Sequence, residues 1–289
     1  MKPTSIIFMI LAAVLIVVGV VVCIVGGSMA GNDDPLLCDV IDAEGNEITT
    51  HTLTEFDLTD IDIDIKNAEV NIIGQSTENY IEFKNINTVT YDLVINKHKL
   101  ILTSVNPFNI SSMVKFRENE GGFGGLRHYL YLGRYKDKVA QINIYVTPET
   151  SLNSIKVHVK NGDVTVKNMI SDTEYDLSAV KGNVVYENTN TAASLAVSAK
   201  KGNFTFNSSD VKSLDFTIEN GNGKFTLNKQ YNFSCQCESG KIYLDDENIG
   251  DSYAGVYPEA AAEEGAEIVL PNAVKGKITS GDLVIDTAE

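Results

Sequence analysis

The sequence predicts an all-β repeat protein, and three observations carry this prediction. Six stretches share one pattern, in which apolar residues at alternate positions lead through a polar corner to further alternating apolar residues. Five of these copies follow one another at intervals of about 20 residues, and a fixed period of this size is typical of repeat architectures. Alternation with a period of two belongs to strands that have one buried and one exposed face. Helical periodicity is nearly absent after residue 27.

The first element is an uncharged apolar stretch over residues 6–27. About 20 apolar residues in a helix cross a hydrocarbon core of roughly 30 Å, so this stretch predicts a transmembrane anchor. Lys2 precedes it and Asp33 follows it, which places residues 1–5 in the cytosol and the rest of the chain outside the cell membrane. We expect a single-pass membrane protein, with removal of the stretch as a signal peptide near Met29 as the alternative.

The exported part begins with a polar, aperiodic stretch over residues 28–56, which predicts a stalk, and residues 57–288 carry the strand patterns. The interval from Ile65 to Val70 equals that from Val159 to Val164. The domain therefore opens on a divergent first copy that lacks the corner glycine.

Three acidic residues of this first copy, Asp60, Asp62 and Asp64, share the outward face of one strand. Hard cations bind clusters of carboxylate oxygens, so these residues are weak candidates for a calcium site. A solvated polar face has the same composition, and no metal site is predicted elsewhere. Further strands are expected at residues 80–83, 91–95, 100–102 and 139–146.

A segment without strand alternation, residues 106–138, interrupts the domain between the last two of these strands. It combines cations with aromatic residues on a chain that is otherwise acidic, and long irregular insertions are often functional or mobile. Cations attract phosphates and aromatic rings stack on sugars or cations, so the segment is the candidate binding region. Its candidate contact residues are Lys115, Arg117, Phe123, Arg127, His128, Tyr131 and Arg134. The alternative is a surface loop whose aromatic residues pack back on the β-domain.

The two halves of each repeat copy meet at a glycine, and these glycines are Gly162, Gly182, Gly202, Gly221, Gly240 and Gly281. The interval across the corner reverses the parity of the alternation, so the chain must turn there, and glycine permits the positive φ of such a turn. The corner at residues 220–223 is interpreted as longer than the others. Stacked coils of a β-solenoid explain the equal spacing of the copies. A β-meander or sandwich with hairpin turns is the alternative.

Composition narrows the function classes further. The net charge of −16 disfavours binding to nucleic acid. Cys235 and Cys237 lie two apart on one strand, roughly 7 Å from each other, which is too far for a disulfide between them. We interpret them as small core residues, with a redox or metal motif as the alternative. No phosphate loop, nucleophile elbow or metal-ligand spacing of histidines appears, so neither catalysis nor a cofactor is expected.

The strand and proline turn at residues 142–148, the first regular copy at 152–166 and the closing stretch 279–285 together resemble one bacterial family. It is the "putative adhesin" family, a domain of unknown function built from β-strand repeats and common in Gram-positive bacteria. The resemblance implies a cell-envelope role, sometimes beside envelope-stress systems, and supplies no functional residues.

The expected function is therefore that of a membrane-anchored adhesin or cell-envelope binding module, whose partner is a cell-wall polymer or an envelope protein. A scaffold or accessory subunit of an envelope-stress or membrane complex is the first alternative. An enzyme acting on polysaccharides is the second, because β-solenoids with paired carboxylates perform such chemistry.

Overall fold

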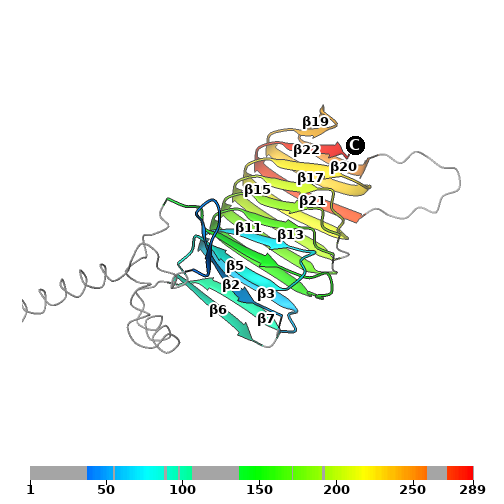
Figure 1. Cartoon of the computed structure of the whole chain (residues 1–289). Coiled ribbons are helices and arrows are strands. Elements are labelled where there is room, and N and C mark those ends of the chain that lie inside the picture. The colour runs from blue at the N-terminus through cyan, green and yellow to red at the C-terminus, as the bar shows by residue number, and fades with distance from the viewer. Residues whose placement is uncertain are drawn as a thin grey trace, which may run out of the picture.

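The computed structural model describes residues 38–54, 56–87, 90–96, 98–105, 137–170, 172–190, 193–258 and 272–288. The anchor expected at residues 6–27 and residues 106–136 of the candidate binding segment lie outside these ranges. The described part is built of strands, and it holds no helix that is long and apolar enough to span a membrane. Figure 1 shows two sheets that run side by side along an elongated body. The expectation of an all-β domain is confirmed.

Each sheet has a continuous order of hydrogen-bonded strands. The first sheet, sheet A, contains in spatial order β1 (Val40–Ile41), β2 (Glu47–Thr52), β5 (Tyr80–Lys84), β8 (Gln141–Tyr145), β4 (Glu69–Ile73), β10 (Val164–Lys167), β12 (Val184–Glu187), β14 (Phe204–Asn207), β16 (Gly223–Leu227), β22 (Leu283–Thr287), β18 (Ile242–Leu244) and β19 (Glu247–Gly250). The second sheet, sheet B, contains β20 (Ser252–Tyr257), β17 (Tyr231–Ser239), β21 (Asn272–Ser280), β15 (Ser213–Asn220), β13 (Ser194–Lys201), β11 (Glu174–Lys181), β9 (Ser154–Asn161), β3 (Asp60–Asn67), β7 (Lys99–Ser104) and β6 (Tyr91–Asn96).

Every repeat copy forms one coil, with a long strand in sheet B and a short strand in sheet A. Neighbouring coils are parallel and in register, as in the pairing of Val164 with Val184 and of Val184 with Phe204. The corner at Gly162 joins β9 to β10, which lie in different sheets, so it is not a hairpin turn. The solenoid is therefore confirmed and the meander is wrong.

The strands β1 and β2 lie within residues 28–56, the stretch expected to be an irregular stalk. They extend sheet A, because β2 pairs antiparallel with β5 and β1 pairs with β2. Leu53 and Leu58 are buried in the core beside them.

The core between the sheets is made of the inward residues of all coils, stacked in columns. Tyr186, Phe206 and Phe225 form one such column, with ring centroids 5.8 Å and 5.7 Å apart. Aromatic pairs at these separations add to the stabilisation that comes from burial alone. The alternation seen in the sequence thus reflects a single continuous core.

The corner glycines are required mainly because the coils approach one another closely. A Cβ on Gly202 would lie 1.9 Å from the carbonyl oxygen of Gly182, and a Cβ on Gly182 would lie 2.0 Å from that of Gly162. The same contact, at 1.9 or 2.0 Å, recurs at all six corner glycines, whereas five of the six have positive φ and Gly240 does not. The φ-based explanation is therefore incomplete.

A ladder of side-chain amides and carboxylates follows these glycines. Asp163 Oδ1 accepts a hydrogen bond from the backbone N–H of Asn183 at 2.7 Å, and Asn183 Oδ1 accepts one from Asn203 at 2.9 Å. The ladder continues through Asn222 and Asp282 and ends at Lys241. Each rung satisfies a backbone donor that the turn leaves outside the strand ladder.

The interpretation of residues 220–223 as a longer corner is wrong. Asn220 pairs with Lys201 and Gly223 pairs with Phe204, so this corner has the same length as its neighbours. Gly223 occupies an inward position, where the Leu283 side chain of the next coil fills the space of the missing side chain. Phe225 consequently belongs to the column of Phe206 and not to that of Phe204.

The spatial order of the coils departs from the order in the sequence at both ends. The coil β21–β22 lies between β15–β16 and β17–β18, although the last two are consecutive in the chain. At the other end, β7 and β8 pair with β3 and β4 and form a further coil, which the sequence pattern did not reveal. In the sequence, residues 106–136 separate these two strands.

Candidate functional site

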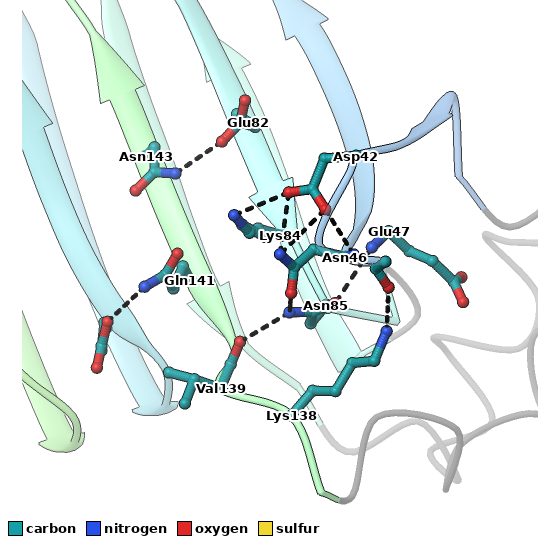
Figure 2. Close-up of polar contacts among 12 residues, drawn as sticks. Asp42, Asn46, Glu47, Glu82, Lys84, Asn85, Lys138, Val139, Gln141 and Asn143 are labelled. Carbon is teal, nitrogen blue, oxygen red and sulfur yellow. Dashed lines mark hydrogen bonds and ion pairs between the residues drawn. The ribbon is translucent and has the colours of Figure 1, made fainter.

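The candidate functional site is the outward face of sheet A at the end that carries the N-terminal strands. We call it the polar face and define it by the side chains of Glu69 and Asn71 on β4, Glu82 and Lys84 on β5, and Gln141 and Asn143 on β8. These residues alternate with core residues such as Val70, Ile81 and Ile142, so the strand pattern directs them away from the core. Asn143 is nevertheless buried beneath its neighbours on this face. Figure 2 shows the polar contacts of this region.

The side chains of the polar face are joined to one another by short hydrogen bonds. Asn71 Nδ2 donates to Asn143 Oδ1 at 2.7 Å, and Asn143 Nδ2 donates to Glu82 Oε1 at 2.7 Å. Gln141 Nε2 donates to Glu69 Oε2 at 2.7 Å. The amides are thereby held in one orientation, which is a requirement for selective polar recognition.

Two paired tyrosines border the polar face, Tyr80 at the start of β5 and Tyr145 at the end of β8. The rings of Tyr80 and Tyr145 are stacked with centroids 4.2 Å apart. Burial raises the pKa of Tyr80, and burial together with nearby Glu82 raises the pKa of Tyr145 to about 12. Both phenols are therefore neutral hydrogen-bonding groups at physiological pH.

Lys138 and Val139, which precede β8, are held beside the polar face by hydrogen bonds. Lys138 Nζ donates to the carbonyl oxygen of Gly45, and Asn85 Nδ2 donates to the carbonyl oxygens of Val139 at 3.2 Å and of the Asn46 side chain at 2.8 Å. Asn85 also accepts the backbone N–H of Glu47. The hairpin between β1 and β2 thus holds the returning strand in place (Figure 2).

A carboxylate stabilises this hairpin. Asp42 accepts hydrogen bonds from the Asn46 side chain and backbone, and its other contact is an ion pair with Lys84 at 3.0 Å. The Asn46 side chain, the Asn46 backbone and Lys84 together hold the pKa of Asp42 well below its usual range. Asp42 is therefore ionised throughout the physiological pH range.

The seven candidate contact residues between Lys115 and Arg134 all lie outside the described residues. The structure does describe the two strands on either side of this segment in the sequence. The strand β7 ends at Ser104, the strand β8 begins at Gln141, and both belong to one coil. The backbone N–H of Glu69 donates to Ala140 at 2.9 Å, so the end of the segment lies against the first repeat coil. The polar face itself was missed, since its strands are brought together only by pairing between distant parts of the sequence.

Protein donors already engage two of the three weak calcium candidates. Ser154 Oγ donates to Asp60 at 2.6 Å, and Lys99 Nζ donates to Asp62 at 2.7 Å. The Ser154 and Thr59 hydroxyls lower the pKa of Asp60. Within the described ranges, no group of three or more His, Cys, Asp and Glu side chains is arranged to hold a metal ion. These contacts occupy carboxylate oxygens of Asp60 and Asp62 that a cation would need.

One row on sheet B contains the residue types of a hydrolase triad. Asp64, His158 and Ser178 occupy paired positions on β3, β9 and β11, and His158 Nδ1 lies 2.7 Å from Ser178 Oγ. A working triad needs the carboxylate hydrogen-bonded to the imidazole and an oxyanion site beside the nucleophile. Asp64 and His158 both belong to the described residues, and no hydrogen bond joins them; both side chains are exposed. The row lacks the orientation that acyl transfer requires.

The two cysteines of β17 point into the core. Cys235 and Cys237 are buried and form no disulfide, and they stand in the columns of Val157 and Val159, respectively. Burial raises the pKa of Cys235 to about 12 and that of Cys237 to about 11. Thiols of this kind are inert as nucleophiles and as metal ligands, so their interpretation as core residues agrees with the structure.

The sequence of this β-solenoid matches a known protein family. The family model of Toastrack DUF4097 matches residues 58–289. The chain belongs to this family. This is consistent with the adhesin-like family proposed from the sequence.

Solved structures with a similar course of the chain share little sequence with this Toastrack protein. A "putative cell adhesion protein" from Clostridium sporogenes is 10% identical, with 84% of this chain and 99% of that chain covered and a TM-score of 0.48. A "putative adhesin" from Bacteroides fragilis is 13% identical, with 84% and 97% covered and a TM-score of 0.43. A "putative lipid binding protein" from Parabacteroides distasonis is 9% identical, with 84% and 97% covered and a TM-score of 0.32. No curated protein matches the chain.

Proposed function

We propose that this protein is a membrane-anchored, extracytoplasmic binding module of the cell envelope, adhesin-like and without catalytic activity. In this proposal, the residues 6–27 anchor it in the membrane. The β-solenoid holds a contact region made of the polar face and the basic aromatic segment 106–138.

The observation that carries the proposal is the fixed attachment of this segment. Asn85, Asn46 and Lys138 hold the returning chain to the β1–β2 hairpin at the edge of the polar face. A rigid base lowers the entropy that a contact loop loses on binding, and this loss otherwise reduces affinity.

The chemistry of the region favours a glycan that carries anionic groups. The segment supplies cations for phosphate or carboxylate groups and aromatic rings for sugar faces. The polar face supplies oriented amides and the carboxylates of Glu69 and Glu82, which suit hydroxyl groups. Anionic cell-wall polymers combine both kinds of group.

The test is binding of the full chain, in detergent micelles, to purified cell-wall fractions. Alanine at Lys115, Arg117, Arg127 and Arg134 should abolish binding, because the cations that neutralise the polymer are removed. The matched control replaces four exposed lysines of the repeat coils, Lys160, Lys181, Lys201 and Lys224, which lowers the net charge equally and should leave binding intact. Equal losses in both variants would show that only net charge matters and would refute a localised site.

A scaffold role is the second candidate, and one observation favours it. The strand β6 is the last strand of sheet B at the same end, and its Val94 side chain is 40% exposed. An exposed edge strand can accept a strand from a partner protein. Replacing Val94 by lysine should abolish co-purification of an envelope protein if the scaffold role holds, whereas binding to cell-wall fractions should not change.

A further inference from the structure

The inserted coil β21–β22 connects two groups of strands that share no other strand pairing among the described residues. The strands β17 and β18 pair with β21 and β22 on one side and with β20 and β19 on the other. The strands β15 and β16 meet the opposite edges of the same coil. The unit β17–β20, residues 231–257, is therefore paired with the rest of the two sheets through this one coil (Figure 1). Its Tyr231 also contacts the preceding coils, through a hydrogen bond to the carbonyl oxygen of Ser209 at 2.9 Å.

The position between these neighbours is specific for this coil. The Phe216 ring of β15 lies where a Cβ of Gly276 would be, at 2.0 Å from the ideal Cβ position. The equivalent residues in the other coils are Val157, Leu177, Val197, Phe216 and Cys235, and each carries a side chain that the ring would exclude. No other repeat coil of the described chain can thus occupy the position in this register.

Further contacts hold both ends of the inserted coil. Asn272 Nδ2 donates to the carbonyl oxygen of Val211 at 2.6 Å, and the backbone N–H of Thr287 donates to Asp245 Oδ1 at 3.2 Å. Asp282 continues the ladder of the corners, since its N–H donates to Asn222 at 2.8 Å and its Oδ1 accepts from Lys241 at 2.7 Å. Specific contacts therefore hold the coil at its start, at its corner and at its end.

We propose that the binding position between β15–β16 and β17–β18 also accepts residues 272–287 of a second copy of this chain, so that two copies exchange the inserted coil. Residues 259–271 separate the coil from β20 in the sequence, and the coil forms the same interactions whichever copy supplies it. Exchange of an identical element costs little free energy, because the second copy restores every interaction that the first copy gives up. The Gly276–Phe216 fit restricts the partner to a second copy. The inference does not depend on what the protein binds.

The test uses two full chains with different tags, co-expressed in membranes. One copy carries Ser234→Cys and the other carries Lys275→Cys. These two exposed residues are direct partners on β17 and β21, and neighbouring strands bring their Cα atoms to about 4.8 Å, within the range of a disulfide. Oxidation should produce a covalent heterodimer carrying both tags.

Three controls decide the result. A mismatched pair, Ser234→Cys with Thr205→Cys on the other sheet, should give no heterodimer. Adding Gly276→Val to the Lys275→Cys copy should abolish the heterodimer, because valine cannot share the space of the Phe216 ring. A single chain with both cysteines shows that the coil occupies its position. A cross-link only within single chains, or none in any combination, would overturn the proposal.

Discussion

The glycine at each corner is the residue on which coil stacking depends most directly. Gly202→Ala would place a methyl group 1.9 Å from the carbonyl oxygen of Gly182, against backbone that cannot move aside. We expect the free energy of unfolding to fall by about 3 kcal/mol, as overpacking of a rigid site does. Thermal or denaturant unfolding measures the loss. Gly45→Ala is the control, since it also has positive φ but nothing within 4 Å, and it should cost only about 1 kcal/mol. Equal losses would contradict the contact argument.

Thiol reactivity provides a second prediction at the residue scale. With pKa values of about 12 and 11, Cys235 and Cys237 are almost fully protonated at pH 8, and both are buried. We expect no labelling of either residue by a thiol reagent in the native protein and complete labelling after unfolding, as read by mass spectrometry. The exposed cysteine of Lys275→Cys is the positive control. Rapid native labelling at β17 would mean that the strand opens, or that the thiols have a chemical role.

At the scale of elements, the β1–β2 hairpin is expected to be acid-sensitive. The pKa of Asp42 is lower in the folded protein than in the unfolded chain, where it is about 4. A lowered folded pKa contributes stability that is present above the unfolded pKa and is lost as pH falls below about 4 toward the folded value. The protection factors of the amides in residues 40–52, each taken relative to the intrinsic exchange rate at the same pH, should therefore fall as the pH drops below about 4. In Asp42→Asn, these protection factors should already be lower at pH 7 and should vary less with pH.

The inserted coil makes a second prediction for elements. Gly276→Val should prevent β21 from seating beside Phe216, and it should release the pairing of β17 with the rest of sheet B. We expect fast amide exchange in residues 231–257 and retained protection in β9–β14. The control is Gly255→Ala on β20, where the nearest atom is the movable hydroxyl of Tyr253. Protection of β17 in the valine variant would show that the unit is held by core packing alone.

The elements that the sequence predicts correctly are those whose pattern lies within one short stretch of the chain. The regular coils were predicted because each one is marked by its own alternation and its own glycine. The coil β7–β8 was missed because residues 105–140 separate its two strands, and the Gly223 register was misassigned because a second glycine resembles a longer corner. The polar face depends on pairing of β5 with β8 across some 60 residues, for which a single sequence carries no signal.

For the whole molecule, we expect the N-terminus in the cytosol and the β-domain on the outer side of the membrane. A tag after residue 288 should be cleaved from intact cells by an added protease, whereas a tag before residue 1 should be protected until the cells are lysed. The physical reason is the order of Lys2, the apolar stretch and Asp33. Immunoblotting of both tags measures the outcome. Release of the protein into the medium with a new N-terminus near residue 30 would instead show cleavage of a signal peptide.

The coils in the middle of the solenoid follow the order of the sequence, whereas those at both ends do not. This difference determines where the protein can gain or lose length. Between β9 and β16, chain order and spatial order agree, and each coil meets its neighbours through the same glycine contact and the same amide rung. Duplicating one such unit would extend the body by about 4.8 Å and leave both ends unchanged. Growth at either end would require the crossed connections there to be rebuilt. Variation in reach among related proteins should therefore arise from gain or loss of central units.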